Sequence, residues 1–174
     1  RRPQGAGATA HLALLLLLQV PGAVTVGRVT AVAWPGQGPL ARALATAADH
    51  TPPFPGIGPL PDRPIRLILT PTRADFDSLT RGRLPPWSEG AAFPDAGTIV
   101  LLATRPPDRL AAALRHELAH LVLRWRLRHP PPLWFDEGYA AFAAGEWDRL
   151  EGLRLNWQIA RGVRMSLADV DRAL

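Results

Sequence analysis

Residues 106–140, PPDRLAAALRHELAHLVLRWRLRHPPPLWFDEGYA, contain the most informative pattern in the chain. Leucine and alanine recur through the first part, which predicts a largely apolar helix that starts after Pro106-Pro107 and ends near Leu127. Asp108 is the expected N-cap of this helix. Three consecutive prolines then interrupt the chain, and the residues after them predict a second helix that ends near Gly145.

The first helix contains an H-E-x-x-H pattern, His116-Glu117-Leu118-Ala119-His120. Side chains four positions apart share one face of a helix, so both imidazoles can bind one metal ion, with Glu117 close enough to exchange a proton with water on that metal. Imidazole suits Zn²⁺, whose catalytic sites combine three protein ligands with one open position. The alternative is that His116 and Glu117 are solvated surface residues, and the apolar flanks of the pattern argue against it.

A third metal ligand is expected from Glu137, seventeen residues after His120. Its neighbour Asp136 is also a carboxylate, but adjacent helical residues point about 100° apart, so only one of the two can face the histidines. The longer side chain favours Glu137, and Gly138 beside it is expected to leave room for the first helix. Asp136 is then expected to cap its helix or to orient a ligand histidine through a hydrogen bond.

The chain has 20 basic residues, all arginine, and 15 acidic ones, which gives a formal net charge of +5. This charge alone would suit a module that binds nucleic acid or another anionic surface. Exclusive use of arginine beside abundant alanine, proline and glycine instead indicates coding bias. Arg124, Arg126 and Arg128 fan around the polar side of their helix, which is typical of a solvated face, so we expect no nucleic-acid partner. The absence of cysteine excludes disulfides and thiolate metal sites.

Residues 1–23 have the features of a secretory signal peptide: two arginines, an apolar core over residues 12–20, and the small residues of Pro21-Gly22-Ala23. The apolar run is too short to span a bilayer as a mature helix. The alternative is a buried N-terminal helix or strand. We therefore expect an extracytoplasmic protein (secreted, periplasmic or membrane-attached) whose N-terminal segment brings it close to a membrane and whose catalytic domain comprises residues 24–174.

The remaining segments predict an α+β fold with a small mixed or antiparallel sheet that precedes the two site-bearing helices. β-Branched and apolar runs predict strands at residues 24–34, 65–70 and 98–104. Helical spacing predicts further helices at residues 40–50, 72–79 and 146–164, with loops at 51–64 and 85–94. Thr72, with Asp75 three residues later, is the expected N-cap of the second of these helices. Ser166 with Asp169 predicts another helix start, so the C-terminal helical part is expected to be incomplete in this chain.

The two motifs together resemble those of zinc metallopeptidases of the gluzincin type, and the closer likeness is to bacterial peptidase MA-like domains. Those domains pair H-E-L-x-H with P-x-W-[LF]-x-E-G-x-A, and here the second motif is the segment Pro132-Leu133-Trp134-Phe135-Asp136-Glu137-Gly138-Tyr139-Ala140. The resemblance implies a zincin-like fold, one zinc ion bound by His116, His120 and Glu137, and Glu117 as the catalytic acid and base. Thermolysin has an aspartate four residues after its glutamate ligand, and residue 141 here is alanine.

The resemblance also implies a peptide or protein substrate. In the family the strand before the active-site helix commonly lies at a sheet edge, which implies that Ile99, Val100 and Leu101 bind an extended substrate by strand addition. The nearly continuous apolar run of this strand favours instead an ordinary core position.

A non-catalytic zinc-binding scaffold domain of the same fold is the alternative function. The intact Glu117 argues against it, because a structural zinc site has no need of a base. Trp134 and Phe135 are expected to lie in the core rather than in a substrate pocket. Tyr139 points to a different helix face from Glu137 and is expected to serve packing rather than catalysis.

Overall fold

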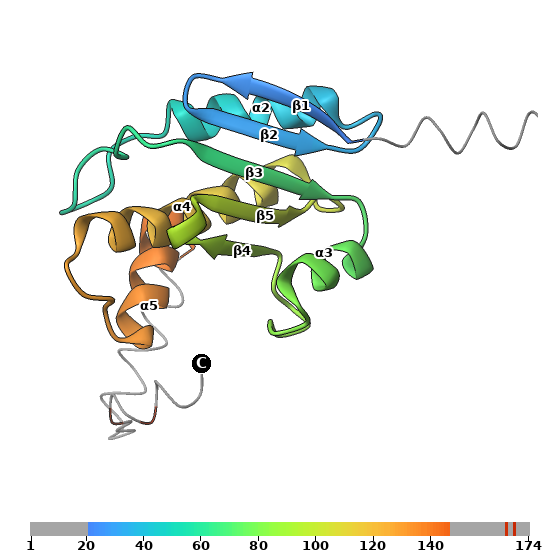
Figure 1. Cartoon of the computed structure of the whole chain (residues 1–174). Helices are drawn as coiled ribbons and strands as arrows, with labels where there is room; N and C mark the ends of the chain where they lie inside the picture. Colours follow the sequence, from blue (N-terminus) through green and yellow to red (C-terminus); the bar gives the residue numbers. More distant parts are fainter. Residues whose placement is uncertain (1–20, 147–165, 167–168, 170–174) are drawn as a thin grey trace, which may run out of the picture.

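A computed structural model of the chain describes residues 21–146, 166 and 169, which form the α+β fold shown in Figure 1. One mixed sheet has the strand order β1-β2-β3-β5-β4. Its strands are β1 (Gly22–Val26), β2 (Val29–Ala33), β3 (Ile65–Thr70), β4 (Gly90–Phe93) and β5 (Thr98–Leu102). The helices are α2 (Gly38–Asp49), α3 (Arg73–Thr80), α4 (Pro107–Arg126) and α5 (Leu133–Ala144), with a 3-10 turn η1 (Pro94–Ala96) before β5. The expected mixed sheet is confirmed, with β2, β3 and β5 parallel and β1 and β4 antiparallel to their neighbours.

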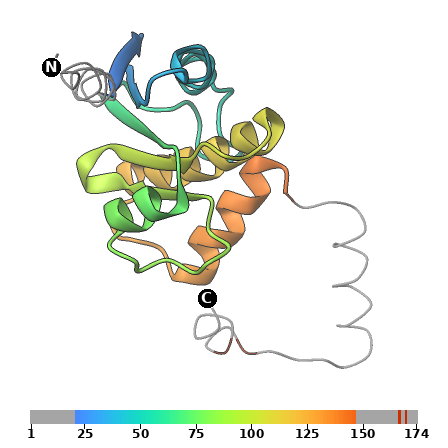
Figure 2. The same ribbon diagram turned by 90° about the vertical axis from the view of Figure 1, so that its right-hand side faces the viewer.

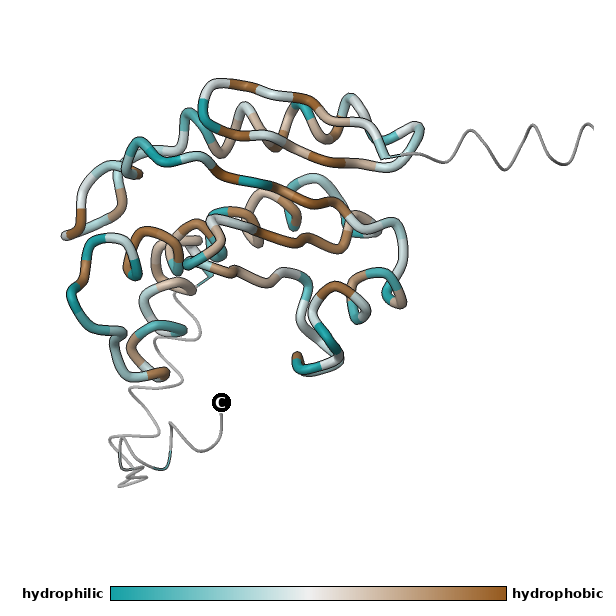
Figure 3. Tube along the Cα trace, viewed as in Figure 1, coloured by the Kyte–Doolittle hydropathy of each residue, from teal (hydrophilic) through white to brown (hydrophobic). Residues whose placement is uncertain are grey.

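Helices cover both faces of this sheet (Figure 2). Leu67 and Leu69 of β3 point to one face and pack in the main core with leucines of α2 and α4. Ile68 and Val100 point to the other face, where Phe76 of α3 packs against them. The central strands β3 and β5 are accordingly the most hydrophobic part of the sheet (Figure 3). This core holds α4 firmly against the sheet, which fixes the helix that carries the H-E-x-x-H residues.

The single strand expected over residues 24–34 is wrong, because the chain reverses at Gly27 and forms a hairpin. Gly27 has φ of +51° at the first of two loop positions, as type II′ hairpins require. An added Cβ at Gly27 would lie 2.3 Å from Oδ2 of Asp49, so this turn needs glycine for space as well as for conformation. The Asp49 carboxylate accepts hydrogen bonds from the backbone N–H and the Nε of Arg28, both at 3.1 Å.

The loop expected at residues 85–94 contains the strand β4, which forms one edge of the sheet. As a result β5 pairs with β3 on one side and β4 on the other. Ile99, Val100 and Leu101 are 0%, 2% and 0% exposed. The expectation that these residues bind substrate at a sheet edge is therefore wrong, and the alternative of a core strand is correct.

Two predicted helix starts have different outcomes. Thr72 caps α3 as expected, because its Oγ1 accepts a hydrogen bond from the backbone N–H of Asp75 at 3.2 Å. The N-cap predicted at Asp108 is wrong. Pro106 occupies that position, and Asp108 lies in the first turn of α4. There its negative charge still interacts favourably with the positive end of the helix dipole.

Several predicted segments lie outside the described residues: residues 1–20 of the predicted signal peptide and nearly all of the helices predicted at 146–164 and 166–174. Gly22, which the signal-peptide prediction includes, lies in β1 opposite Ala33. Within the described part of the chain, no helix has both the length and the hydropathy to cross a membrane.

Candidate metal centre

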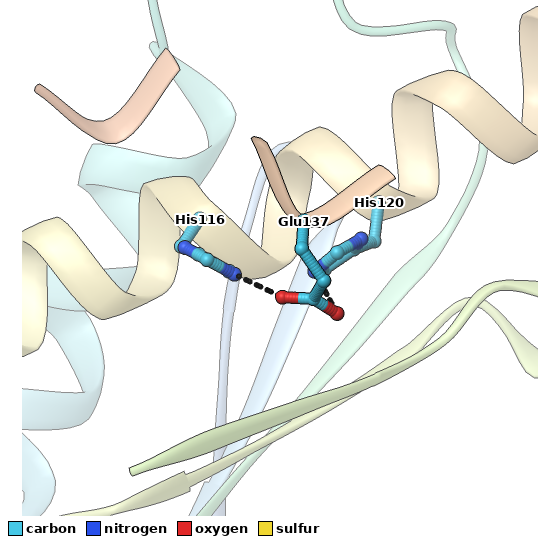
Figure 4. A group of neighbouring side chains, drawn as sticks. All are labelled: His116, His120 and Glu137. Atoms are coloured by element: carbon cyan, nitrogen blue, oxygen red, sulfur yellow. Dashed lines mark ion pairs between the residues drawn. The ribbon is translucent and has the colours of Figure 1, made fainter. Parts of the chain in front are cut away.

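The packing of α5 against α4 brings His116, His120 and Glu137 together (Figure 4). One donor atom from each lies within 4.8 Å of the other two. Nε2 of His116 is 3.5 Å from Oε2 of Glu137, and Nε2 of His120 is 3.8 Å from Oε1 of the same carboxylate. Ligand atoms about 2.0–2.1 Å from a tetrahedral zinc lie roughly 3.3 Å apart. The three side chains therefore fit one zinc ion after only small movements.

Each histidine also contacts a carboxylate through its other ring nitrogen. Nδ1 of His120 is 2.8 Å from Oδ1 of Asp136. Asp136 therefore occupies the position from which the sequence predicts that it orients a ligand histidine. Nδ1 of His116 is 3.2 Å from Oε2 of Glu146, a residue that the sequence did not single out. Glu146 follows α5 directly, and its spacing from the two motifs carries no recognisable signal. Such contacts select the tautomer that leaves Nε2 free to bind a metal.

The charges of the site favour a cation. Burial acts to lower the pKa of His116, but its hydrogen bonds to the carboxylates of Glu137 and Glu146 outweigh that effect and raise the pKa to about 10. Burial also acts to lower the pKa of His120, but the hydrogen bond with Asp136 outweighs that effect and raises the pKa. The pKa of Glu137 is lowered, chiefly by its hydrogen bond with His116. Carboxylates thus surround the imidazoles closely enough to favour positive charge at this position.

Glu117 lies beside the three candidate ligands and is 8% exposed. Burial raises the pKa of its carboxyl to about 7, against the opposing effect of His120 and His116. The backbone of β4 passes directly over this side chain, because a Cβ added at Gly90 would lie 2.5 Å from Oε1 of Glu117. Gly90 was not predicted from the sequence to lie at this site. A glycine within a strand is a known sign of close approach by another group, but the residues around Gly90 are too weakly strand-forming for that sign to be recognised from the sequence.

Small residues of α5 allow the close approach to α4. Ala140 and Ala143 are 0% and 7% exposed, and Nε of Arg115 on α4 donates a hydrogen bond to the carbonyl of Ala143 at 2.7 Å. The expectation that Gly138 makes room for α4 is wrong, because a Cβ at that position would have no atom within 4 Å. Gly138 therefore offers a substitution next to Glu137 that disturbs no packing.

The aromatic residues at the start of α5 contact one another and the loop that contains Pro55. Tyr139 donates a hydrogen bond to the carbonyl of Pro55 at 2.8 Å and stacks on Phe135, so its expected packing role fits the structure. Phe135 is 39% exposed, and the expectation that it lies in the core is wrong. Trp134 is half-buried and contacts Phe135 edge to face. The three arginines at the C-terminal end of α4 are exposed, as a solvated face requires.

A scan against models of known protein families found no match to this chain, and a search of curated proteins found no similar sequence.

Proposed function

We propose that this protein is a zinc-dependent peptidase of the gluzincin type with a zincin-like fold. The observation that carries the proposal is the convergence of His116, His120 and Glu137 around one position, with the buried carboxyl of Glu117 beside it. Zinc bound there would lower the pKa of its water to near neutrality and polarise the carbonyl of a peptide bond. The signal-like N-terminal segment further supports an extracytoplasmic location.

Glu117 is the residue that moves protons in this proposal. It accepts a proton from the attacking water and then gives that proton to the departing amine. Burial keeps the carboxyl able to gain and lose a proton near neutral pH, since it raises the pKa to about 7. A general acid and base works best when its pKa lies close to the working pH. The buried position also excludes bulk water that would compete for the proton.

The edge strand β4 supports a peptide as the substrate. The backbone N–H of Leu102 donates to the carbonyl of Glu89 at 2.9 Å, so this pair is a hydrogen-bonded pair of the antiparallel ladder. By alternation, the backbone groups of Gly90 and Ala92 point away from β5. No strand among the described residues pairs with that side of β4. An extended peptide can add to this edge and would pass Glu117, which Gly90 contacts.

A non-catalytic zinc scaffold accounts less well for Glu117. Burying a carboxyl group costs free energy unless the group is fully hydrogen-bonded. A buried carboxyl group is therefore expected to have a function. A structural zinc site is closed by four protein ligands, whereas among the described residues only His116, His120 and Glu137 converge here and leave one position open. The burial of Glu117 against Gly90 therefore favours catalysis.

Cleavage of fluorescein-labelled casein, with and without a chelator, tests the proposal. The zinc-loaded wild type is expected to cleave casein, to lose activity with the chelator and to regain it with added zinc. Glu117→Gln should retain zinc and lose cleavage by several orders of magnitude, because the amide cannot accept the proton. Asp95→Asn, which changes an acid with an 86% exposed side chain, is the matched control and should behave as wild type. Equal cleavage by wild type and Glu117→Gln would overturn the assigned mechanism.

A further inference from the structure

A carboxylate at each end of α5 contacts the Nδ1 atom of one of the two candidate ligand histidines. Asp136, in the first turn, contacts Nδ1 of His120 at 2.8 Å. Glu146, immediately after the last turn, contacts Nδ1 of His116 at 3.2 Å. Residue 141, one helical turn after Glu137, is alanine and supplies no carboxylate. Among the described residues, Glu146 is therefore the acid that reaches Nδ1 of His116.

The position of Glu146 is fixed by its backbone rather than by burial of its side chain, which is 41% exposed. Gly145 ends α5 with φ of +74°. The N–H of Glu146 donates to the carbonyl of Ala141 at 3.0 Å, and the N–H of Gly145 donates to that of Phe142 at 3.1 Å. These bonds have the pattern of a Schellman motif, in which a left-handed glycine turns the chain back over the helix end. The turn directs the carboxylate of Glu146 toward α4.

Arg115, the neighbour of His116, ties the same turn to the rest of the molecule. It donates to the carbonyl of Ala143 at 2.7 Å and to Oγ1 of Thr51 at 2.7 Å. Its guanidinium also lies over the ring of Phe54, 4.5 Å from the centroid. The end of α5 is thus attached to α4 at the residue next to His116. The turn at Gly145 and the hydrogen bonds of Arg115 together hold Glu146 in contact with His116.

We propose that Glu146 is a positioning residue of the zinc site, which holds the Nδ1–H of His116 and thereby presents its Nε2 to the metal. This inference rests on the proposed function, since it assumes that His116 binds zinc. A carboxylate at Nδ1 fixes the ring orientation and the tautomer of a metal-binding histidine and makes its other nitrogen a stronger ligand. Glu146 does for His116 what Asp136 does for His120, from the opposite end of α5.

Competitive zinc titration of the wild type, Glu146→Ala and Glu146→Gln tests this role. Removing such a partner typically weakens metal binding roughly 10- to 100-fold, which is the loss expected for Glu146→Ala. Glu146→Gln should lose less, because its amide oxygen still accepts the Nδ1–H. Asp95→Ala removes an exposed carboxylate that contacts Arg124 and should leave zinc affinity unchanged. Circular dichroism of each variant verifies that the fold is retained.

The Nδ1–H proton resonances of the zinc-loaded protein provide a readout that loss of stability alone would not move. Glu146→Ala should shift the resonance of His116 and leave that of His120 in place, because Asp136 is intact. Failure of the wild type to bind zinc would overturn the proposed function, and the role of Glu146 with it. If the wild type binds zinc but Glu146→Ala binds it equally well, with an unchanged His116 resonance, only the role of Glu146 is overturned.

Discussion

The contact between Gly90 and Glu117 predicts a strong coupling that can be measured without any substrate. A Cβ at Gly90 would lie 2.5, 2.8 and 2.9 Å from Oε1, Cγ and Cδ of Glu117. All three distances are shorter than van der Waals contact, so either the side chain or β4 must move. Gly90→Ala should therefore lower the free energy of unfolding by about 1–3 kcal/mol, the usual cost of overpacking a filled site.

The double variant isolates this contact, because Glu117→Ala removes the three atoms that lie nearest to the new methyl group. In that background Gly90→Ala should have a small effect, or stabilise by about 0.4–1 kcal/mol through the lower entropy of the unfolded chain. The two substitutions should thus show a coupling energy on the order of 1–3 kcal/mol in urea unfolding at constant pH.

Gly138→Ala is the matched control for this cycle. It lies next to Glu137, and its Cβ would have no atom within 4 Å. Within a helix, alanine is favoured over glycine by roughly 1 kcal/mol, so this variant should be at least as stable as the wild type in both backgrounds. If Gly90→Ala changes stability equally with and without the Glu117 side chain, the packing of β4 over Glu117 is not as described.

Three further predictions concern the hairpin turn and the metal. The hydrogen bonds from Arg28 hold the pKa of Asp49 below its ordinary value of 3.8, so their stabilisation is present above that pH and is lost as the pH falls through the folded-state pKa. Urea unfolding between pH 2 and pH 7 should show this loss in the wild type and not in Asp49→Asn. Gly27→Ala should destabilise by about 1–3 kcal/mol, because the position has positive φ and lies against Asp49, and an unchanged midpoint would refute the turn assignment. Free zinc at 100 times its Kd should stabilise the wild type by about 2.7 kcal/mol in thermal unfolding, an increase that a chelator should abolish.

Residues with local signals were predicted well from the sequence. A run of apolar and β-branched residues identified β3, and leucine spacing identified α4 to within one or two residues of its ends. Thr72 was recognisable as a cap because capping involves residues only three positions apart. The placement of His116 and His120 on one face of α4 likewise follows from helical spacing alone.

The features that the sequence analysis missed depend on contacts between distant segments. The reversal at Gly27 has a glycine signal, but the β-branched residues on both sides of it favoured one continuous strand. The interior position of β5 depends on β4 adding beyond it, and Gly90-Ala91-Ala92-Phe93 has few of the residues that typify a strand. Glu146 reaches His116 only because a left-handed glycine reverses the chain after α5. The spacing of residues in the sequence does not indicate this contact.

The most direct test of the account is the zinc stoichiometry and affinity of the purified wild type, Glu137→Ala and Asp136→Ala in one buffer. The wild type is expected to bind one zinc ion per chain. Glu137→Ala should lose most of that binding because it removes a ligand, whereas Asp136→Ala should bind roughly 10- to 100-fold more weakly because it only releases His120 from its orienting partner. A wild type that binds no zinc, or an Asp136→Ala variant that loses the metal while Glu137→Ala retains it, would contradict the assigned ligand set.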